Sequence, residues 1–123
     1  ANGKITSFTD LNAWKEGHKL VLKIYETTEH FPPKEVFGLT SQMRRAAVSI
    51  TSNIAEGFSR NTSKDKCQLY TIAQGSLTEL QNQLLIARDI SYIKEEDFQK
   101  IAEQTVIVNK LINGLKRIRD TKY

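Results

Sequence analysis

Hydrophobic residues recur at intervals of three and four over most of this chain, which is the spacing of one face of an α-helix. Four segments follow this pattern, at about residues 9–30, 40–60, 63–91 and 95–120. The stretches between them are short, and none of them has the strict alternation of a half-buried strand. The pattern predicts an all-α fold, an antiparallel up-down four-helix bundle. Residues 9–120 form a single domain in this interpretation, and residues 1–8 form a flexible N-terminus.

Local residues indicate where these helices begin and end. Thr9 or Asp10 can cap the first helix, and Pro32-Pro33 stops it because proline removes a backbone donor. Thr62, followed by Asp65, resembles a capping box at the start of the third helix. The four helices therefore have local start and stop signals as well as apolar faces.

Two glycine positions predict close packing. Gly57 falls near the end of the second helix, where a residue without a side chain can close the helix or allow close approach. Gly75-Ser76 lies in the middle of the third helix, where glycine costs about 1 kcal/mol relative to alanine. We interpret Gly75 as the site of a close helix crossing.

The second helix carries two ordered faces. Its apolar row predicts a core-facing stripe and consists of Met43, Ala46, Ala47, Ile50 and Ile54. A polar row beside it consists of Gln42, Arg45, Ser49, Asn53, Glu56 and Arg60. An ordinary surface helix needs only the apolar row. We therefore predict that Gln42, Arg45, Ser49, Asn53 and Glu56, together with Glu79 of the third helix, form a polar packing surface inside the bundle or between subunits.

The adjacent residues Arg44 and Arg45 point about 100° apart on a helix, so they cannot serve one flat patch equally. We expect Arg45 to lie inward with the polar row, with Glu56 or Glu79 as its partner, and Arg44 to face outward. An ion pair within or between subunits is one role for these arginines, and direct contact with phosphate is the other.

The net charge of +4 is concentrated in two regions of an otherwise balanced chain. Basic residues can attract phosphate, although Lys and Arg at the end of a helix also complement its dipole without any ligand. The residues that could contact nucleic acid are Arg44, Arg60, Lys64, Lys66, Lys110, Lys116, Arg117, Arg119 and Lys122.

The sequence contains none of the motifs expected for a metal site, a phosphate-binding loop or an enzyme active site. Neither His18 nor His30 has a glutamate three residues before it, as a di-iron bundle requires, and Cys67 has no metal-ligand partner at the usual spacing. No phosphate-binding glycine loop occurs. We therefore expect no cofactor, no metal and no enzyme activity. A single cysteine and the lack of a membrane-spanning apolar run predict a cytoplasmic protein.

The sequence also contains motifs of a known family. In order along the chain they are Leu11-x-x-Trp14, Tyr25, Phe31-Pro32-x-x-Glu35, Phe37-Gly38-Leu39-x-x-Gln42, Arg45-Ala46-Ala47-x-Ser49-Ile50, Asn53-Ile54-Ala55-Glu56-Gly57 and Ala73-x-Gly75-Ser76-x-x-Glu79-Leu80. With their spacing, these motifs resemble the bacterial 23S rRNA intervening-sequence protein family over about residues 8–115. The basic tail after Leu115 lies outside the resemblance.

The resemblance implies a small cytoplasmic four-helix bundle. It is also similar to the accessory variability determinant of diversity-generating retroelements, a pentameric ring that acts with a reverse transcriptase and binds nucleic acid. The implied function is therefore a homo-oligomer, with five subunits, that binds RNA or DNA through basic surface residues. The alternative is a protein-interaction scaffold or accessory subunit without nucleic-acid affinity, for which a reverse transcriptase is one implied partner.

Overall fold

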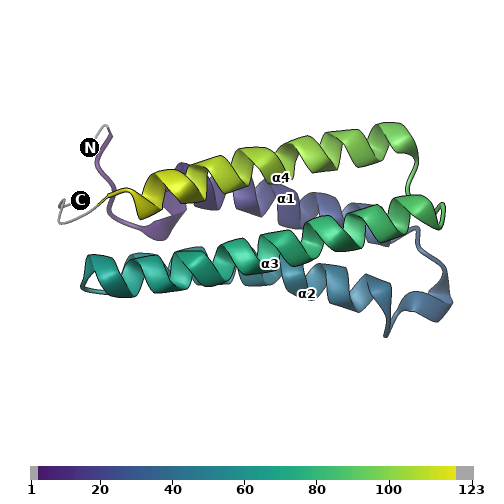
Figure 1. The fold of residues 1–123 in the computed structure, drawn as a ribbon, viewed down its shortest axis with the longest axis horizontal. Coiled ribbons are helices and arrows are strands. Elements are labelled where there is room, and N and C mark those ends of the chain that lie inside the picture. Colours follow the sequence, from purple (N-terminus) through teal and green to yellow (C-terminus); the bar gives the residue numbers. More distant parts are fainter. Residues whose placement is uncertain (1–2, 119–123) are drawn as a thin grey trace.

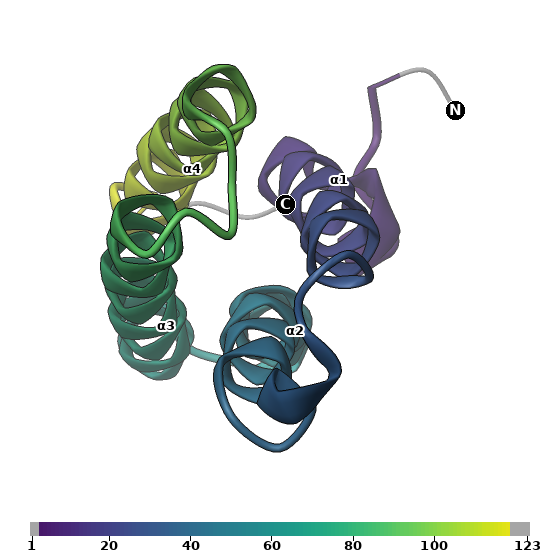
Figure 2. The ribbon, with the colours of Figure 1, turned by 90° about the vertical axis from the view of Figure 1, so that its right-hand side faces the viewer.

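The computed structural model describes residues 3–118, which form four long helices and two short 3-10 turns (Figure 1). In chain order the elements are η1 (Phe8–Asp10), α1 (Asn12–Thr28), η2 (Pro33–Glu35), α2 (Leu39–Ser59), α3 (Ser63–Asp89) and α4 (Glu95–Lys116). No strand occurs within residues 3–118. Each helix packs against its neighbour in the chain, and α4 closes the bundle against α1 (Figure 2). The all-α four-helix bundle predicted from the sequence is confirmed.

Contacts between helices show that consecutive helices run in opposite directions. Ser49 of α2 bonds Ser76 of α3, while Gly57, further along α2, lies against Tyr70, nearer the start of α3. Likewise the thiol of Cys67 near the start of α3 reaches the carbonyl of Lys116 at the end of α4. Figure 1 shows the same reversal at every connection, so the two described chain ends lie at one end of the bundle.

The first helix begins later than the sequence predicted. Ser7 and Asp10 form a capping box around η1, in which the hydroxyl of Ser7 accepts from the N–H of Thr9 and Asp10 Oδ2 accepts from the N–H of Ser7. The regular helix α1 then starts at Asn12, after Leu11, which makes no side-chain cap. The prediction that Thr9 or Asp10 caps α1 is therefore wrong, because Asp10 belongs to the preceding turn.

The other helix boundaries agree closely with the prediction. Thr62 caps α3 by accepting a hydrogen bond of 3.1 Å from the N–H of Asp65, as its capping-box-like sequence indicated. The helix α4 ends at Lys116, and the predicted extension to Asp120 reaches beyond the described residues.

The core lies along the axis of the bundle, and the apolar row of α2 is at its centre. Met43, Ala46, Ala47, Ile50 and Ile54 are all buried, as predicted. Burial of these side chains, with their counterparts on the other three helices, is the main source of the stability of such a bundle.

The two glycine predictions have different outcomes. A Cβ atom added at Gly57 would lie 2.6 Å from Cε1 of Tyr70, so of the two roles predicted for Gly57 the structure shows the close approach. A Cβ atom at Gly75 would meet nothing within 4 Å, so the predicted crossing at Gly75 is wrong for the single chain. Its neighbour Ser76 makes the contact with α2 instead.

Candidate nucleic-acid interface

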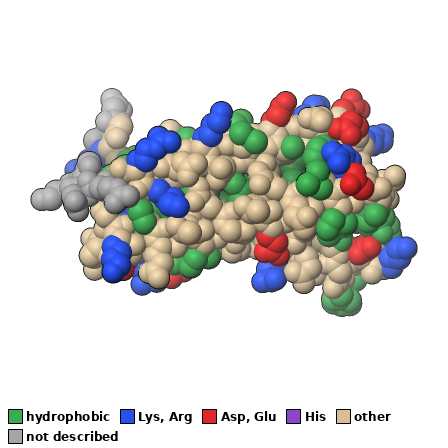
Figure 3. All heavy atoms as spheres, in the orientation of Figure 1, with side chains coloured by type: hydrophobic (Ala, Val, Ile, Leu, Met, Phe, Trp, Pro, Cys, Tyr) green, Lys and Arg blue, Asp and Glu red, His purple; other side chains and the backbone are tan. Residues whose placement is uncertain are grey.

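The antiparallel fold brings the two basic regions of the sequence to one end of the molecule. The end of α2, the start of α3 and the last turns of α4 meet there, and Figure 3 shows blue side chains over this end as well as on the other half of the face. We call this region the basic end and define it by Arg60, Lys64, Lys66, Lys110, Lys116 and Arg117. The nearby acidic residues of the same helix ends are Glu56 and Asp65. Positive charge therefore exceeds negative charge at this end.

Three cations of the basic end are anchored by neighbouring groups. Lys66 Nζ donates to the carbonyl of Phe58 at 2.6 Å, and burial lowers the pKa of this lysine. Lys116 Nζ donates to Gln74 Oε1 at 2.9 Å. Arg60 forms an ion pair with Glu56, one helical turn earlier. These contacts hold the three charges at defined positions.

The other three cations of the basic end face solvent. Lys64, Lys110 and Arg117 are exposed, and none of the ion pairs between described residues involves them. A shallow groove of about 590 Å³ separates the helices beside Arg117 and Lys116. Exposed cations beside a groove can neutralise the phosphates of a nucleic-acid backbone.

The helix dipoles act on this end in two opposite ways. The N-terminus of α3 carries partial positive charge and favours an anion near Lys64. The C-terminus of α4 carries partial negative charge, which stabilises Lys116 and Arg117 without a ligand. Lys116 and Arg117 thus have a structural role that does not depend on phosphate.

Arg44 does not belong to this interface. It lies near the start of α2, toward the opposite end of the bundle, where its Nε donates to Thr28 Oγ1 at 2.8 Å. Its guanidinium also lies 4.6 Å from the ring centroid of Tyr25 and 3.8 Å from Glu29. The expectation that Arg44 faces outward is wrong, because its side chain fastens α2 to the last turns of α1.

Arg45 occupies the position that had been expected for Arg44. Its side chain is exposed, donates to Gln42 Oε1 at 3.2 Å and forms no ion pair within residues 3–118. Its predicted partners bond elsewhere: Glu56 pairs with Arg60, and Glu79 accepts from Gln83. The predicted inward ion pair of Arg45 is therefore wrong within the single chain, and an ion pair between subunits stays a prediction.

Only the middle of the polar row packs against another helix. The hydroxyls of Ser49 and Ser76 are 2.8 Å apart across α2 and α3, and Asn53 Nδ2 donates to the carbonyl of Ser49 at 2.8 Å. Gln42 and Glu56 face solvent, as Glu79 does on α3. The row therefore forms a short polar seam between two exposed ends.

The remaining two basic candidates lie beyond the part of the chain that the structure describes. Arg119 and Lys122 follow Ile118, the last described residue, so their predicted contribution to the interface stays a prediction.

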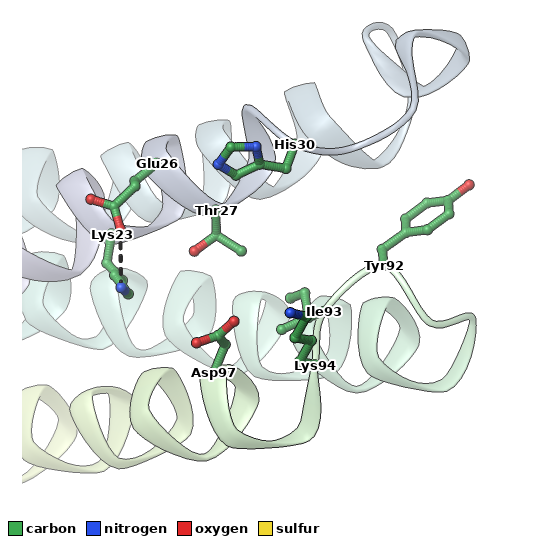
Figure 4. Close-up of a pocket in the computed structure, with 8 residues that line it drawn as sticks. All are labelled: Lys23, Glu26, Thr27, His30, Tyr92, Ile93, Lys94 and Asp97. Carbon is green, nitrogen blue, oxygen red and sulfur yellow. Dashed lines mark hydrogen bonds and ion pairs between the residues drawn. The ribbon is translucent and has the colours of Figure 1, made fainter.

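At the opposite end of the bundle a cleft of about 350 Å³ separates α1 from the start of α4 (Figure 4). Charges of both signs line it, and Lys23 Nζ donates to Glu26 Oε1 at 3.0 Å. His30 and Asp97 project from opposite sides of this cleft. No group of three or more His, Cys, Asp or Glu among residues 3–118 is arranged to hold a metal ion. The cleft has no excess of positive charge comparable to that of the basic end, because Glu26 and Asp97 line it together with Lys23 and Lys94.

Acidic side chains gather on this opposite end of the molecule. Glu95, Glu96 and Asp97 occupy the first turn of α4, where negative charge complements the helix dipole. Figure 3 shows red side chains on that half of the visible face. Lys94 and Lys100 are exposed at this end as well, so it carries both signs of charge and lacks the positive excess of the basic end. No helix among residues 3–118 combines the length and apolar character that crossing a membrane demands.

Together, these features define a small four-helix bundle with an excess of positive charge at one end. The sequence model of the 23S rRNA-intervening sequence protein family matches residues 9–114, which is most of the chain. The chain belongs to this family. No curated protein matches it in sequence.

A solved structure supports the fold. It is a crystal structure of a protein of unknown function from the S23 ribosomal protein family of Bacteroides thetaiotaomicron. It is similar with a TM-score of 0.78 at 20% sequence identity, over 86% of this chain and 96% of the other. Likeness at this identity shows a shared bundle architecture.

Proposed function

We propose that this protein is a non-enzymatic, cytoplasmic homo-oligomer that binds RNA or DNA through its basic end. The observation that carries the proposal is the convergence of two basic regions, about 50 residues apart in the sequence, on one end of the bundle. Lys64, Lys110 and Arg117 provide exposed charge there, and the anchored Lys66 and Lys116 reinforce it.

Binding of this kind reads the backbone rather than the bases. Contacts from Lys and Arg to phosphate fix position but carry no sequence information. The aromatic ring of Phe58 at this end lies under Lys66, with 5.2 Å between the ammonium and the ring centroid. This ring is therefore occupied by a cation rather than free to stack on a base. We accordingly propose affinity with little base preference and steep dependence on salt.

Charge reversal tests the proposal directly. The triple variant K64E, K110E, R117E should bind fluorescent 20-nucleotide RNA and DNA at least tenfold more weakly in anisotropy titrations at 50 mM salt. The slope of log affinity against log salt should fall by about one for each phosphate that the variant no longer neutralises.

The matched control changes charge equally at other exposed lysines. Lys19, Lys94 and Lys100 are exposed on α1 and around the start of α4, outside the basic end. The variant K19E, K94E, K100E has the same net charge as the test variant. Equal loss of affinity in both variants would mean that overall charge, and not the basic end, attracts nucleic acid.

A second candidate function is a protein-interaction scaffold or accessory subunit without nucleic-acid affinity, for which a reverse transcriptase is a candidate partner. The exposed apolar side chains favour it, because Phe37 and Leu22 are 93% and 57% exposed in the single chain. A wild-type oligomer that shows no binding to RNA or DNA even at 20 mM salt would support this function and overturn the leading one.

The oligomer is a separate part of the proposal, and we propose five subunits. Chromatography with light scattering gives the mass of the particle, and absorbance at 260 and 280 nm gives any co-purifying nucleic acid. A particle of five 14.0 kDa chains is the expected result. A monomer would overturn this part.

A further inference from the structure

The connector between α1 and α2 presents an unusually exposed aromatic side chain. Phe37 is 93% exposed and Val36 beside it is 51% exposed, so together they form a projecting apolar knob. An aromatic side chain gains most from burial against another surface, and exposed aromatics are enriched where proteins associate. No described residue of the same chain covers this ring.

The knob is held on a rigid support. The N–H groups of Val36 and Gly38 donate to the carbonyls of Pro33 and Glu35, at 3.1 and 2.9 Å. Glu35 Oε1 accepts from the N–H of Leu39 at 3.1 Å. A Cβ atom at Gly38 would lie 2.7 Å from Glu35 Oε1, so a side chain at this position would displace the carboxylate that accepts from Leu39. A preorganised knob loses little conformational freedom when it binds.

An apolar groove lies on another side of the same molecule. It has a volume of about 200 Å³ between α3 and α4 and is lined by Leu84, Leu85, Phe98, Ala102 and Val106. Leu85 and Val106 are 42% and 48% exposed at its rim. Green side chains mark this region on the face of α3 and α4 in Figure 3.

The buried hydroxyl in the groove is already paired. Thr105 Oγ1 accepts from Gln81 Nε2 at 3.0 Å and donates to the carbonyl of Ala102 at 2.6 Å. An apolar occupant can therefore cover Thr105 without leaving its hydroxyl unpaired, which favours a dry contact.

The knob and the groove cannot meet within one chain. The connector that carries Phe37 lies against α2, and the groove opens between α3 and α4, on a different side of the bundle (Figure 2). Charge also favours a contact between copies: Lys34 is exposed beside the knob, and Glu103 is exposed one turn before Val106 at the groove rim.

We propose that the knob of Val36 and Phe37 inserts into the α3–α4 groove of a second copy of this chain. Two different surfaces meet, so the contact is heterologous. In an open row of copies, one end therefore has an unused knob and the other end has an unused groove. Such contacts build a closed ring when the rotation between copies closes. The inference rests on the homo-oligomer of the proposed function and names the surfaces that build it.

A mixing experiment tests the contact. F37D removes the knob and V106D spoils the groove, whereas L22D changes another exposed apolar residue, on α1, as a matched control. In light-scattering chromatography at about 50 μM, F37D and V106D should each give monomers, and L22D should keep the wild-type mass. An equimolar mixture of F37D and V106D should give dimers, because one intact knob and one intact groove remain.

Any other result of this chromatography experiment contradicts a specific part of the proposal. If F37D or V106D alone keeps the wild-type mass, the knob-and-groove contact is wrong while the oligomer stands. A mixture that stays monomeric points to symmetric contacts, or to a partner protein as the occupant of the groove. Monomeric wild-type protein overturns both this inference and the proposed homo-oligomer. Circular dichroism confirms folding, and the milder pair F37S and V106S repeats the test if either aspartate variant is unfolded.

A nucleic-acid binding assay distinguishes the role of the knob and groove in assembly from the role of the basic end in binding. The groove and the knob lie away from Lys64, Lys110 and Arg117. Monomeric F37D should therefore still bind RNA or DNA, with affinity reduced because several linked basic ends no longer act together. Complete loss of binding in a folded F37D monomer would contradict this separation.

Discussion

The hydroxyl of Tyr92 donates a hydrogen bond of 2.8 Å to Glu35 Oε2 and thereby joins the turn before α4 to the connector before α2. The other oxygen of Glu35 accepts from the N–H of Leu39. Both bonds hold the pKa of Glu35 below its usual range, and the bond from Leu39 has the larger effect. The same bond from Tyr92 to Glu35 raises the pKa of the tyrosine. One carboxylate thus organises the support of the exposed Phe37.

The first prediction concerns the pH dependence of stability. The pKa of Glu35 is lower in the folded protein than its ordinary value of 4.5, so the folded state is favoured at pH above that value. This contribution should disappear as the pH falls from 4.5 through the lowered pKa, because the carboxylate then becomes protonated. E35Q should therefore melt below wild type at about pH 7 and approach it near pH 3. Thermal melting at both pH values measures the difference.

Y92F serves as the control for this prediction, since it removes only one of the two bonds. Its melting temperature at neutral pH should lie between those of wild type and E35Q. A gap between wild type and E35Q that is as wide in acid as at neutral pH would show that the ionised carboxylate is not the stabilising form.

The second prediction compares two glycines of the bundle. G57A places a methyl group against Tyr70 and should cost about 1–3 kcal/mol in the free energy of unfolding, as overpacking does. G75A meets no neighbour and should instead stabilise the helix by about 0.5–1 kcal/mol. Urea denaturation of the two variants gives both values. If G75A also destabilises the protein, another chain must approach α3 at that position.

The third prediction separates the adjacent arginines. R44A removes the donor to Thr28 and the cation stacked on Tyr25, and should cost about 1–3 kcal/mol of stability. R45A changes an exposed side chain and should stay within about 0.5 kcal/mol of wild type. Urea denaturation measures both. Neither variant should weaken RNA binding by more than twofold, and a larger loss with R44A would place Arg44 back in the interface.

The sequence was sufficient to predict the helices because their apolar rows repeat with the helical period. The buried row from Met43 to Ile54 and the cap at Thr62 both follow from spacing alone. The placement of Lys64 near Arg117 follows once the helices are taken as antiparallel with short connections.

The sequence could not predict how each helix is rotated toward its neighbours. Periodicity assigns Arg44 and Arg45 to different faces, but the crossing of α1 and α2 decides which of them meets Thr28. For the same reason the sequence left open whether the polar row packs inside the bundle or between subunits. Within the single chain only Ser49 and Asn53 lie at the seam with α3.

The exposure of Phe37 had no signal in the sequence. A hydrophobic residue between a proline-containing turn and a helix usually packs onto the first turn of that helix, as Leu39 does here against the core. Burial depends on the direction in which the connector leaves α1, and that direction is fixed by the tertiary bonds of Glu35.

The excess of positive charge at the basic end, which includes Arg117, has no counterpart at the end that carries Glu95, so net charge is uneven along the long axis of the bundle. The electric field of a polyanion orients such a molecule during its approach, so that the basic end makes the first contact. Orientation during diffusion raises the association rate, whereas the dissociation rate is determined by short-range contacts. For the proposed binding to RNA or DNA, added salt should therefore lower the association rate more than it raises the dissociation rate.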